Sequence, residues 1–188
     1  MKRLAVGGTM VLIAALLGIF SAWLMLRMGG GAVVNGAWRT GLTVGSTSAD
    51  PYTRARIAIG GLFALNRSET VYFAARTDDD GQPLRGACSY RITGTTLPAR
   101  WWSITAYGTD HFLIPNAPGR YSFNMKTVEP DVAGAFELTA SGREQQGRWL
   151  PTGPDGFELT LRLYNPAAQV VAYPDRLELP RIKRQGDC

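Results

Sequence analysis

The sequence predicts a mainly β protein: an antiparallel β-sandwich with one amphipathic helix, preceded by one transmembrane helix. Three observations lead to this prediction. A continuous hydrophobic segment lies at the N-terminus, one segment with helical periodicity follows it, and short β-branched and aromatic runs separated by turn residues fill the rest of the 188-residue chain. About 150 residues follow the hydrophobic segment, which is enough for one domain with its own core.

The hydrophobic segment runs from Leu4 to Leu26 without an ionisable side chain. At about 1.5 Å per residue it forms a helix of roughly 34 Å, long enough to cross a hydrocarbon core of about 30 Å. Trp23 suits the membrane interface, and Arg27 ends the segment as a polar stop. A cleaved secretory signal is the alternative, but its apolar region usually spans only about 7–15 residues. We therefore expect an uncleaved anchor over residues 1–28.

The net charge of +5 comes mainly from the flanks of this segment. Lys2, Arg3, Arg27 and Arg39 precede residue 41 without any acidic residue, which leaves 16 basic and 15 acidic residues in the remainder. The domain is nearly neutral, so we expect no nucleic-acid partner. The basic residues on the two sides slightly favour a topology with the N-terminus inside and the domain outside the cytoplasm.

A Gly/Ser/Thr-rich segment at residues 29–48 is expected to form a flexible tether that leads into a first short strand around residues 38–44. A helix then begins, because Asp50 can act as N-cap and Pro51 fits the first helical position. The spacing predicts about 15 helical residues whose apolar face packs on the domain. Binding to the membrane surface through arginines is the alternative. The apolar face consists of Tyr52, Ala55, Ile59, Leu62 and Phe63, and the arginines are Arg54 and Arg56.

We expect one domain at residues 49–188. After the helix, its sequence has the pattern of short strands that is typical of a β-sandwich. Glycine, proline and aspartate separate the short runs at positions where a turn is favoured. Antiparallel pairing is expected, because no segment after residue 66 is long enough for a crossover helix. The predicted strands cover residues 70–76, 88–93, 101–107, 112–114, 122–125, 136–140, 156–164 and 177–179.

Five runs in the soluble part resemble one known family in their order and spacing. They are ADPYTRARIAIGGLFAL (49–65), ETVYFAARTDDDGQPLRGACSYRITG (69–94), LPARWWSITAYGTDHFLIPN (97–116), RYSF (120–123) and WLPTGPDGFELTLRLYNP (149–166). Together they resemble the DUF1214 domain family, in a short membrane-anchored bacterial form. The resemblance implies a jelly-roll type of sandwich and no established activity. Larger members carry a second domain, DUF1254, which this sequence lacks. The expected location is therefore the bacterial cytoplasmic (inner) membrane, with a periplasmic C-terminal domain.

Few residues have the types and spacing of a catalytic or metal site. One histidine, His111, lies in a predicted hairpin turn, and no Gly-x-Ser-x-Gly elbow occurs, so we interpret His111 as an exposed turn residue. One histidine and two cysteines cannot form a four-ligand zinc site, and the acidic run at 78–80 lacks the spacing of an EF-hand. We expect no metal and no cofactor.

Two acidic residues are the candidate catalytic groups. Glu137 and Glu158 lie in predicted strands, where they alternate with apolar residues. Glycoside hydrolysis needs two carboxylates that flank one bond, and a sandwich can present such a pair on a concave sheet. The same alternation is typical of a half-solvated strand, so both interpretations stay open.

A candidate ligand surface consists of Arg100, Trp101 and Trp102. Adjacent strand residues point to opposite faces, so one tryptophan should enter the core while the other reaches the second surface. An exposed indole beside an arginine could stack on a sugar or contact a partner protein; a covered packing position is the alternative.

The two cysteines, Cys88 and Cys188, form the only intramolecular disulfide available in an oxidising compartment. The alternative is a small buried Cys88 and a frayed C-terminal tail.

These features favour a membrane-anchored module without enzymatic activity. Its expected partners are the membrane, which it crosses once, and an envelope protein, a ligand or a second copy of the chain. The alternative is an envelope enzyme that acts on a glycan or another polar polymer through paired carboxylates.

Overall fold

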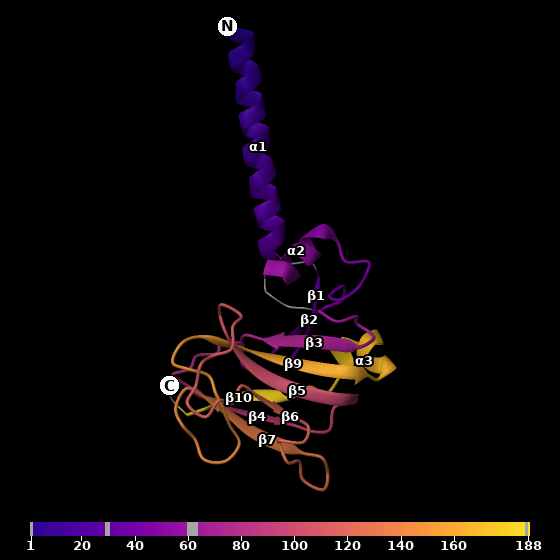
Figure 1. The fold of residues 1–188 in the computed structure, drawn as a ribbon, viewed down its shortest axis with the longest axis vertical. Coiled ribbons are helices and arrows are strands. Elements are labelled where there is room, and N and C mark those ends of the chain that lie inside the picture. The colour runs from indigo at the N-terminus through magenta and orange to yellow at the C-terminus, as the bar shows by residue number, and fades with distance from the viewer. Residues whose placement is uncertain (1, 29–30, 60–63, 187) are drawn as a thin grey trace.

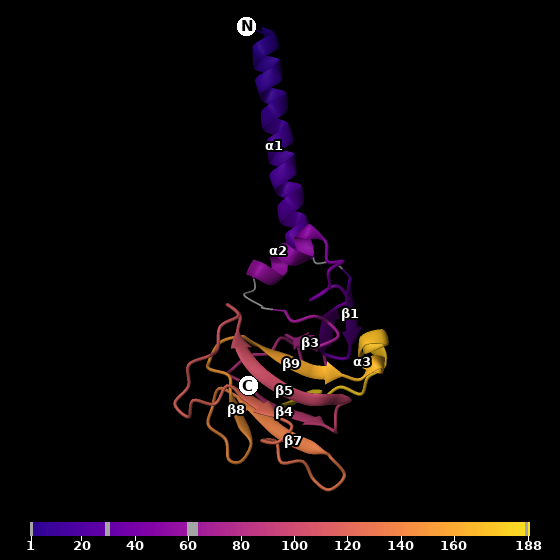
Figure 2. The same ribbon diagram turned by 45° about the vertical axis from the view of Figure 1, so that its right-hand side comes forward.

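Two β-sheets pack face to face, and helix α1 (Lys2–Met28) projects from the side of the larger one (Figure 1). This computed structural model describes residues 2–28, 31–59, 64–186 and 188. The layers follow one another from α1 through the six-stranded sheet to the four-stranded sheet (Figures 1 and 2). The predicted sandwich with a preceding apolar helix is therefore confirmed.

The larger sheet has the strand order β1-β2-β3-β9-β5-β6, and all its neighbouring strands are antiparallel. Its central strand β9 pairs with β3 on one side and β5 on the other. The strands are β1 (Ala32–Asn35), β2 (Trp38–Gly41), β3 (Thr70–Ala75), β5 (Ala99–Gly108), β6 (Ser122–Asn124) and β9 (Phe157–Pro166).

The smaller sheet has the order β10-β4-β7-β8. Its first two pairs are antiparallel, but β8 runs parallel to β7, which the sequence did not indicate. The strands are β4 (Ser89–Gly94), β7 (Phe136–Ser141), β8 (Trp149–Pro151) and β10 (Arg181–Gln185), and helices α3 (Ala168–Ala172) and η1 (Pro174–Arg176) lie between β9 and β10.

The core lies between the sheets because apolar side chains alternate along the strands on their inner faces. The larger sheet contributes Phe73 and Leu161, and the smaller one contributes Ile92 and Leu138, all of them fully buried. Aromatic pairs join the layers, such as Trp102 and Phe136 with ring centroids 4.7 Å apart. The outer face of the larger sheet is thereby free to carry polar residues.

Helix α1 contains the segment Val6–Arg27, which is long and apolar enough to cross a membrane and contains no buried residue. It stands well clear of both sheets (Figure 1). The predicted hydrophobic helix is therefore present, with Trp23 and Arg27 at its C-terminal end.

Helix α2 (Pro51–Ile59) begins where the sequence predicts, but it is shorter and packs differently. It has nine residues, and only Thr53 is buried. Tyr52 and Ile59 are 37 % and 75 % exposed, so the predicted packing of this apolar face on the domain is wrong for these two residues. The remaining predicted face residues Leu62 and Phe63 lie outside the described residues. Tyr52 and Ile59 are exposed because α2 lies against the end of α1 rather than on the core, as Figure 1 also shows.

Several predicted strands shift or disappear. Residues 112–114 form only an isolated bridge between Tyr107 and Leu113, and the last strand begins at Arg181 rather than at residue 177. Strands β1 and β8 were not predicted, because each is short. The hairpin of β1 and β2 lies within residues 29–48, so the larger sheet begins inside the segment that the sequence indicates as a tether.

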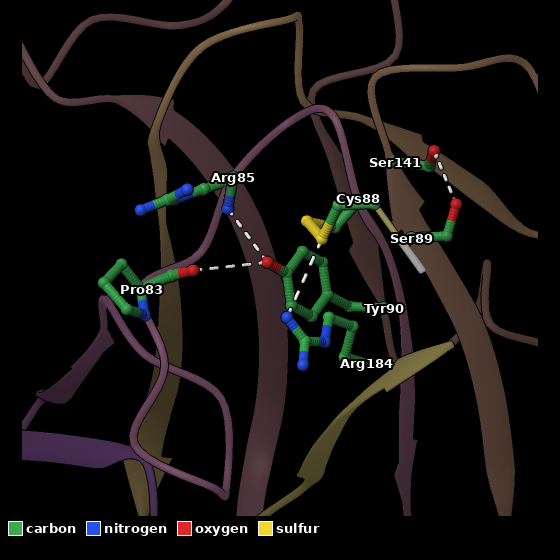
Figure 3. Close-up of a disulfide and its surroundings, with 8 residues drawn as sticks. Pro83, Arg85, Cys88, Ser89, Tyr90, Ser141 and Arg184 are labelled. Atoms are coloured by element: carbon green, nitrogen blue, oxygen red, sulfur yellow. Dashed lines mark hydrogen bonds between the residues drawn. A yellow bond between two sulfur atoms is a disulfide. The ribbon is translucent and has the colours of Figure 1, made fainter. Parts of the chain in front are cut away.

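A disulfide joins Cys88 to Cys188. Figure 3 shows Cys88 beside Tyr90, whose hydroxyl donates to the Pro83 carbonyl and accepts from the Arg85 N–H, and beside Arg184 of β10. Cys88 precedes β4 and Cys188 follows β10, two strands that are hydrogen-bonded neighbours. The bond therefore ties the C-terminal segment to the start of β4 in the smaller sheet.

Replacing both cysteines by serine (C88S/C188S) is expected to lower the free energy of unfolding by about 2–4 kcal/mol, because the cross-link restricts the unfolded chain. Urea denaturation of the full chain in detergent, followed by tryptophan fluorescence, measures this change. Reduced wild-type protein should unfold at the same urea concentration as the double variant. An unchanged midpoint in both would contradict a stabilising disulfide.

Candidate functional site

A cavity of about 740 Å³ lies between the end of α1 and the outer face of the larger sheet. Its floor comes from strands β3, β9 and β5, and its walls come from α1, α2, the β2 region and the turn after β5. We call it the α1-side cavity. It is lined by Trp23, Leu26, Arg27, Ala32, Arg39, Gly41, Thr43, Val44, Thr53, Arg56, Ile57, Ile59, Tyr72, Phe73, Ala74, Arg76, Tyr107, His111, Glu158, Thr160 and Arg162.

The polar floor results from the alternation of strand β9. Leu159 and Leu161 point into the core and are fully buried, whereas Glu158, Thr160 and Arg162 lie on the other face. Each neighbouring strand adds polar side chains to the same face by the same alternation. The cavity is thus built on the rigid centre of the larger sheet.

Glu158 is 8 % exposed and holds two partners. Its Oε2 lies 2.7 Å from Arg76 Nε, and its Oε1 lies 2.9 Å from His111 Nδ1. Since an ionised carboxylate can only accept, Nδ1 donates in this hydrogen bond. Nε2 of His111 then has no hydrogen-bond partner among the residues that the structure describes.

His111 reaches Glu158 because of the turn that follows β5. The N–H of His111 donates to the Gly108 carbonyl, and His111 adopts a φ of +68°, in the left-handed region. The interpretation of His111 as an exposed turn residue is confirmed, because it lies in the turn and is exposed. Its side chain is also paired with the buried carboxylate of Glu158, which the sequence did not indicate. No sequence signal joins these residues, which are 47 positions apart.

Arg162 lies at the centre of the cavity floor. Its guanidinium donates to Tyr107 Oη at 2.8 Å and to Thr105 Oγ1 at 3.2 Å. Its Cζ lies 5.4 Å from the centroid of the Tyr107 ring and 5.9 Å from that of Tyr72. These contacts hold the charge in place without neutralising it.

The cavity carries an excess of positive charge. Five arginines line it against one carboxylate, Glu158, which is already paired with Arg76. Within the described part of the chain, Arg27, Arg39 and Arg162 have no carboxylate within salt-bridge distance. A group of guanidiniums that lack counter-charges favours an anionic ligand, above all a phosphate or carboxylate.

Arg56 joins α2 to the end of α1. It donates to the Met25 carbonyl at 3.0 Å and to Thr53 Oγ1 at 2.8 Å. The N-cap Asp50 accepts from the Thr53 hydroxyl and from backbone N–H groups, and these bonds lower the pKa of the Asp50 carboxyl. The cap and the arginine thereby fix the wall of the cavity that α2 forms.

The predicted catalytic pair is not formed. Glu137 lies on β7 in the smaller sheet and is paired with Arg91 at 3.4 Å. Glu158 lies on β9 in the larger sheet. Their neighbours Leu138 and Leu159 are buried in the core between the sheets, so the two carboxylates point away from each other on opposite outer faces. They cannot flank one bond.

The residues of the predicted ligand surface, Arg100, Trp101 and Trp102, lie on opposite faces of β5. Trp102 is 2 % exposed and packs in the core, while Trp101 lies on the other face of β5, as the alternation predicts. The cation near the Trp101 ring is Lys126, at 6.0 Å from its centroid. Arg100 is exposed at the start of β5, and by alternation it belongs to the opposite face from Trp101. The three residues therefore do not form one surface.

The acidic run has a structural role. Asp78 is buried, and its Oδ1 accepts from the N–H groups of Asp80 and Gln82; Asp79 Oδ2 accepts from the N–H of Ile182 on β10. These bonds form a turn and tie it to the smaller sheet. The described residues contain no group of three His, Cys, Asp or Glu side chains placed to hold a metal ion.

Comparisons with known proteins show the family through a family model and the fold through a solved structure. The model of DUF1214, a protein family of unknown function, matches residues 69–168. The VPA0106 protein from Vibrio parahaemolyticus is similar in structure, with a TM-score of 0.62 and 23 % identity over 74 % of this chain and 36 % of its own. An uncharacterised protein from Burkholderia cenocepacia gives a TM-score of 0.42 and 18 % identity over 87 % of this chain and 38 % of its own.

The chain thus spans little more than a third of the length of these two solved structures. At this identity the similarity to the Vibrio protein shows the fold alone. No curated protein matches the chain. Since the family model covers more than half of the 188 residues, including β3, β4, β5, β6, β7, β8 and β9, this chain belongs to the DUF1214 family of proteins of unknown function.

Proposed function

We propose that this protein is a single-pass, membrane-anchored binding module whose α1-side cavity takes an anionic ligand. The observation that carries the proposal is the set of five arginines against one carboxylate in a cavity of about 740 Å³. This volume lies in the range of about 300–1,000 Å³ that is typical of small-molecule sites. Of the three roles that the sequence favours, namely binding a protein partner, self-association and ligand binding, the cavity supports ligand binding.

The proposed location is the outer face of a bacterial cytoplasmic membrane. Helix α1 supplies a segment that can cross the bilayer. The disulfide between Cys88 and Cys188 fits an oxidising compartment, because cytoplasmic thiols are kept reduced. The basic N-terminal residues Lys2 and Arg3 favour retention of that end in the cytoplasm.

A reporter enzyme that folds only outside the cytoplasm, fused after Cys188, is expected to be active in the full-length protein. The reason is that the C-terminus lies in the same domain that α1 places across the membrane. A matched fusion at the N-terminus should be inactive. The opposite pattern, with an active N-terminal fusion only, would overturn the topology.

Replacing Arg162 by glutamine is expected to weaken binding of inorganic phosphate by roughly ten- to a hundredfold, as for the loss of a hydrogen bond to a charged group worth about 1.5–3 kcal/mol. Calorimetric titration of the full chain in detergent at low salt measures the affinity. R181Q is the matched control, because Arg181 is exposed on β10 in the other sheet. Equal affinities in R162Q and R181Q would contradict a cavity that binds anions.

One observation favours a second candidate, an enzyme that uses acid–base chemistry on a glycan or another polar polymer. The Glu158 carboxylate orients His111 through Nδ1, as a carboxylate does for a histidine general base. The enzyme would then act through this pair rather than through Glu137 and Glu158.

The substitution Glu158→Gln tests the binding role of the cavity further. It keeps the shape and removes the one negative charge of the cavity, so phosphate binding should be kept or tightened if Glu158 only positions Arg76 and His111. The same phosphate titration measures this effect. Loss of phosphate binding in E158Q would contradict the binding role as described.

A further inference from the structure

One wall of the α1-side cavity consists of the last turn of the membrane-crossing segment. Trp23, Leu26 and Arg27 line the cavity, and the segment that can cross a membrane ends at Arg27. The Arg27 guanidinium lies 4.6 Å from the centroid of the Trp23 ring. Tryptophan and arginine at the end of a span lie at the level of the lipid headgroups. A bilayer crossed by α1 therefore places this wall beside lipid phosphates.

Two guanidiniums of the cavity lie on the sheet opposite this wall. Arg39 on β2 is exposed and has no hydrogen bond or ion pair in the described part of the chain. Its register partner on β3 is Ala74, which lines the cavity as well. Arg162 is held by hydroxyl groups and aromatic rings rather than by a carboxylate. A phosphodiester between Arg39 and Arg162 would supply the charge that both lack.

Exposed apolar side chains accompany these cations. Ile59, at the end of α2, lines the cavity and is 75 % exposed. Phe112 follows the cavity residue His111 in the turn after β5 and is 73 % exposed. In Figure 2 strand β5 ends on the side of the domain that faces α1. A lipid has apolar groups next to its phosphate, whereas a free anion or a polar polymer offers nothing to such side chains.

We propose that the ligand of the α1-side cavity is the headgroup of an anionic phospholipid that enters from the membrane crossed by α1. Arg39 and Arg162 bind the phosphate, Trp23 and Arg27 line the entry side, and Ile59 and Phe112 contact the glycerol and the first part of the acyl chains. This inference rests on the proposed function and adds the class of ligand and its source.

The test uses the full chain in nanodiscs of phosphatidylcholine that contain a minor fraction of phosphatidylglycerol. Lipids that remain bound after extraction into detergent are counted by mass spectrometry. Wild-type protein should retain phosphatidylglycerol well above its share in the nanodisc. R39Q should lower this enrichment about fivefold, the typical effect of one basic residue at an anionic surface. R181Q, which changes an equally exposed arginine of the other sheet, should keep it.

A second pair of variants separates a lipid from a soluble anion. F112S removes the exposed apolar side chain that follows the cavity residue His111, and V132S removes one from the loop between β6 and β7. F112S should lower phosphatidylglycerol retention but leave binding of inorganic phosphate unchanged, since phosphate has no apolar part. V132S should change neither quantity.

The outcomes distinguish this inference from the proposed function. Arginine-dependent phosphate binding without phosphatidylglycerol enrichment would overturn the lipid proposal and leave an anion-binding cavity. Absence of both would overturn the inference together with the function on which it rests. Equal enrichment in wild-type, R39Q and R181Q protein would likewise reject the cavity as a lipid site.

Discussion

Strand β9 has one apolar face and one polar face, and both the core and the candidate site are built on it. β9 lies between β3 and β5, so both of its edges are hydrogen-bonded to neighbouring strands. One face buries Leu159, Leu161 and Leu163 in the core, and the other places Glu158 and Arg162 on the floor of the α1-side cavity. A buried charge needs a partner, which explains the contacts of Glu158 with Arg76 and His111. The same alternation thus produces the core and the site.

The charges of the cavity come from parts of the chain that are distant in sequence. The charge count of the sequence is correct in placing basic residues at the flank of the membrane segment and a nearly neutral balance in the domain. That balance conceals how the charges are distributed. Arg27 and Arg39, from the C-terminal flank of the hydrophobic segment, line the same cavity as Arg76 and Arg162 of the larger sheet. A nearly neutral domain can therefore carry a strongly basic site where it faces α1.

Much of the fold could be predicted from sequence because it depends on local periodicity. The apolar length of α1, the cap of α2 at Asp50 and the opposite orientations of Trp101 and Trp102 all follow from patterns over a few residues. The packing of α2 could not be predicted in this way, because an apolar face does not reveal which neighbour covers it. For the same reason the parallel pairing of β8 with β7 was missed.

The candidate site was harder to predict, since it depends on which sheet each strand joins. Glu137 and Glu158 have similar local sequences, yet their strands lie in different sheets and the carboxylates point apart. His111 joins the site through a turn with positive φ and a contact across 47 positions. The whole fold was predicted only through the five sequence runs that resemble the DUF1214 family. The match to the family model confirms that resemblance.

The decisive measurement for lipid binding in the α1-side cavity is the proximity between lipid phosphorus and arginine carbon. Solid-state NMR with phosphorus–carbon dipolar recoupling on the arginine-labelled full chain in phosphatidylglycerol bilayers makes this measurement. If the headgroups of anionic lipids enter the cavity, recoupling is expected at the guanidinium carbons of Arg39 and Arg162 as well as at Arg27. Recoupling confined to Arg27, at the end of α1, would show that lipid phosphates stay outside the cavity and that the cavity is not a lipid site.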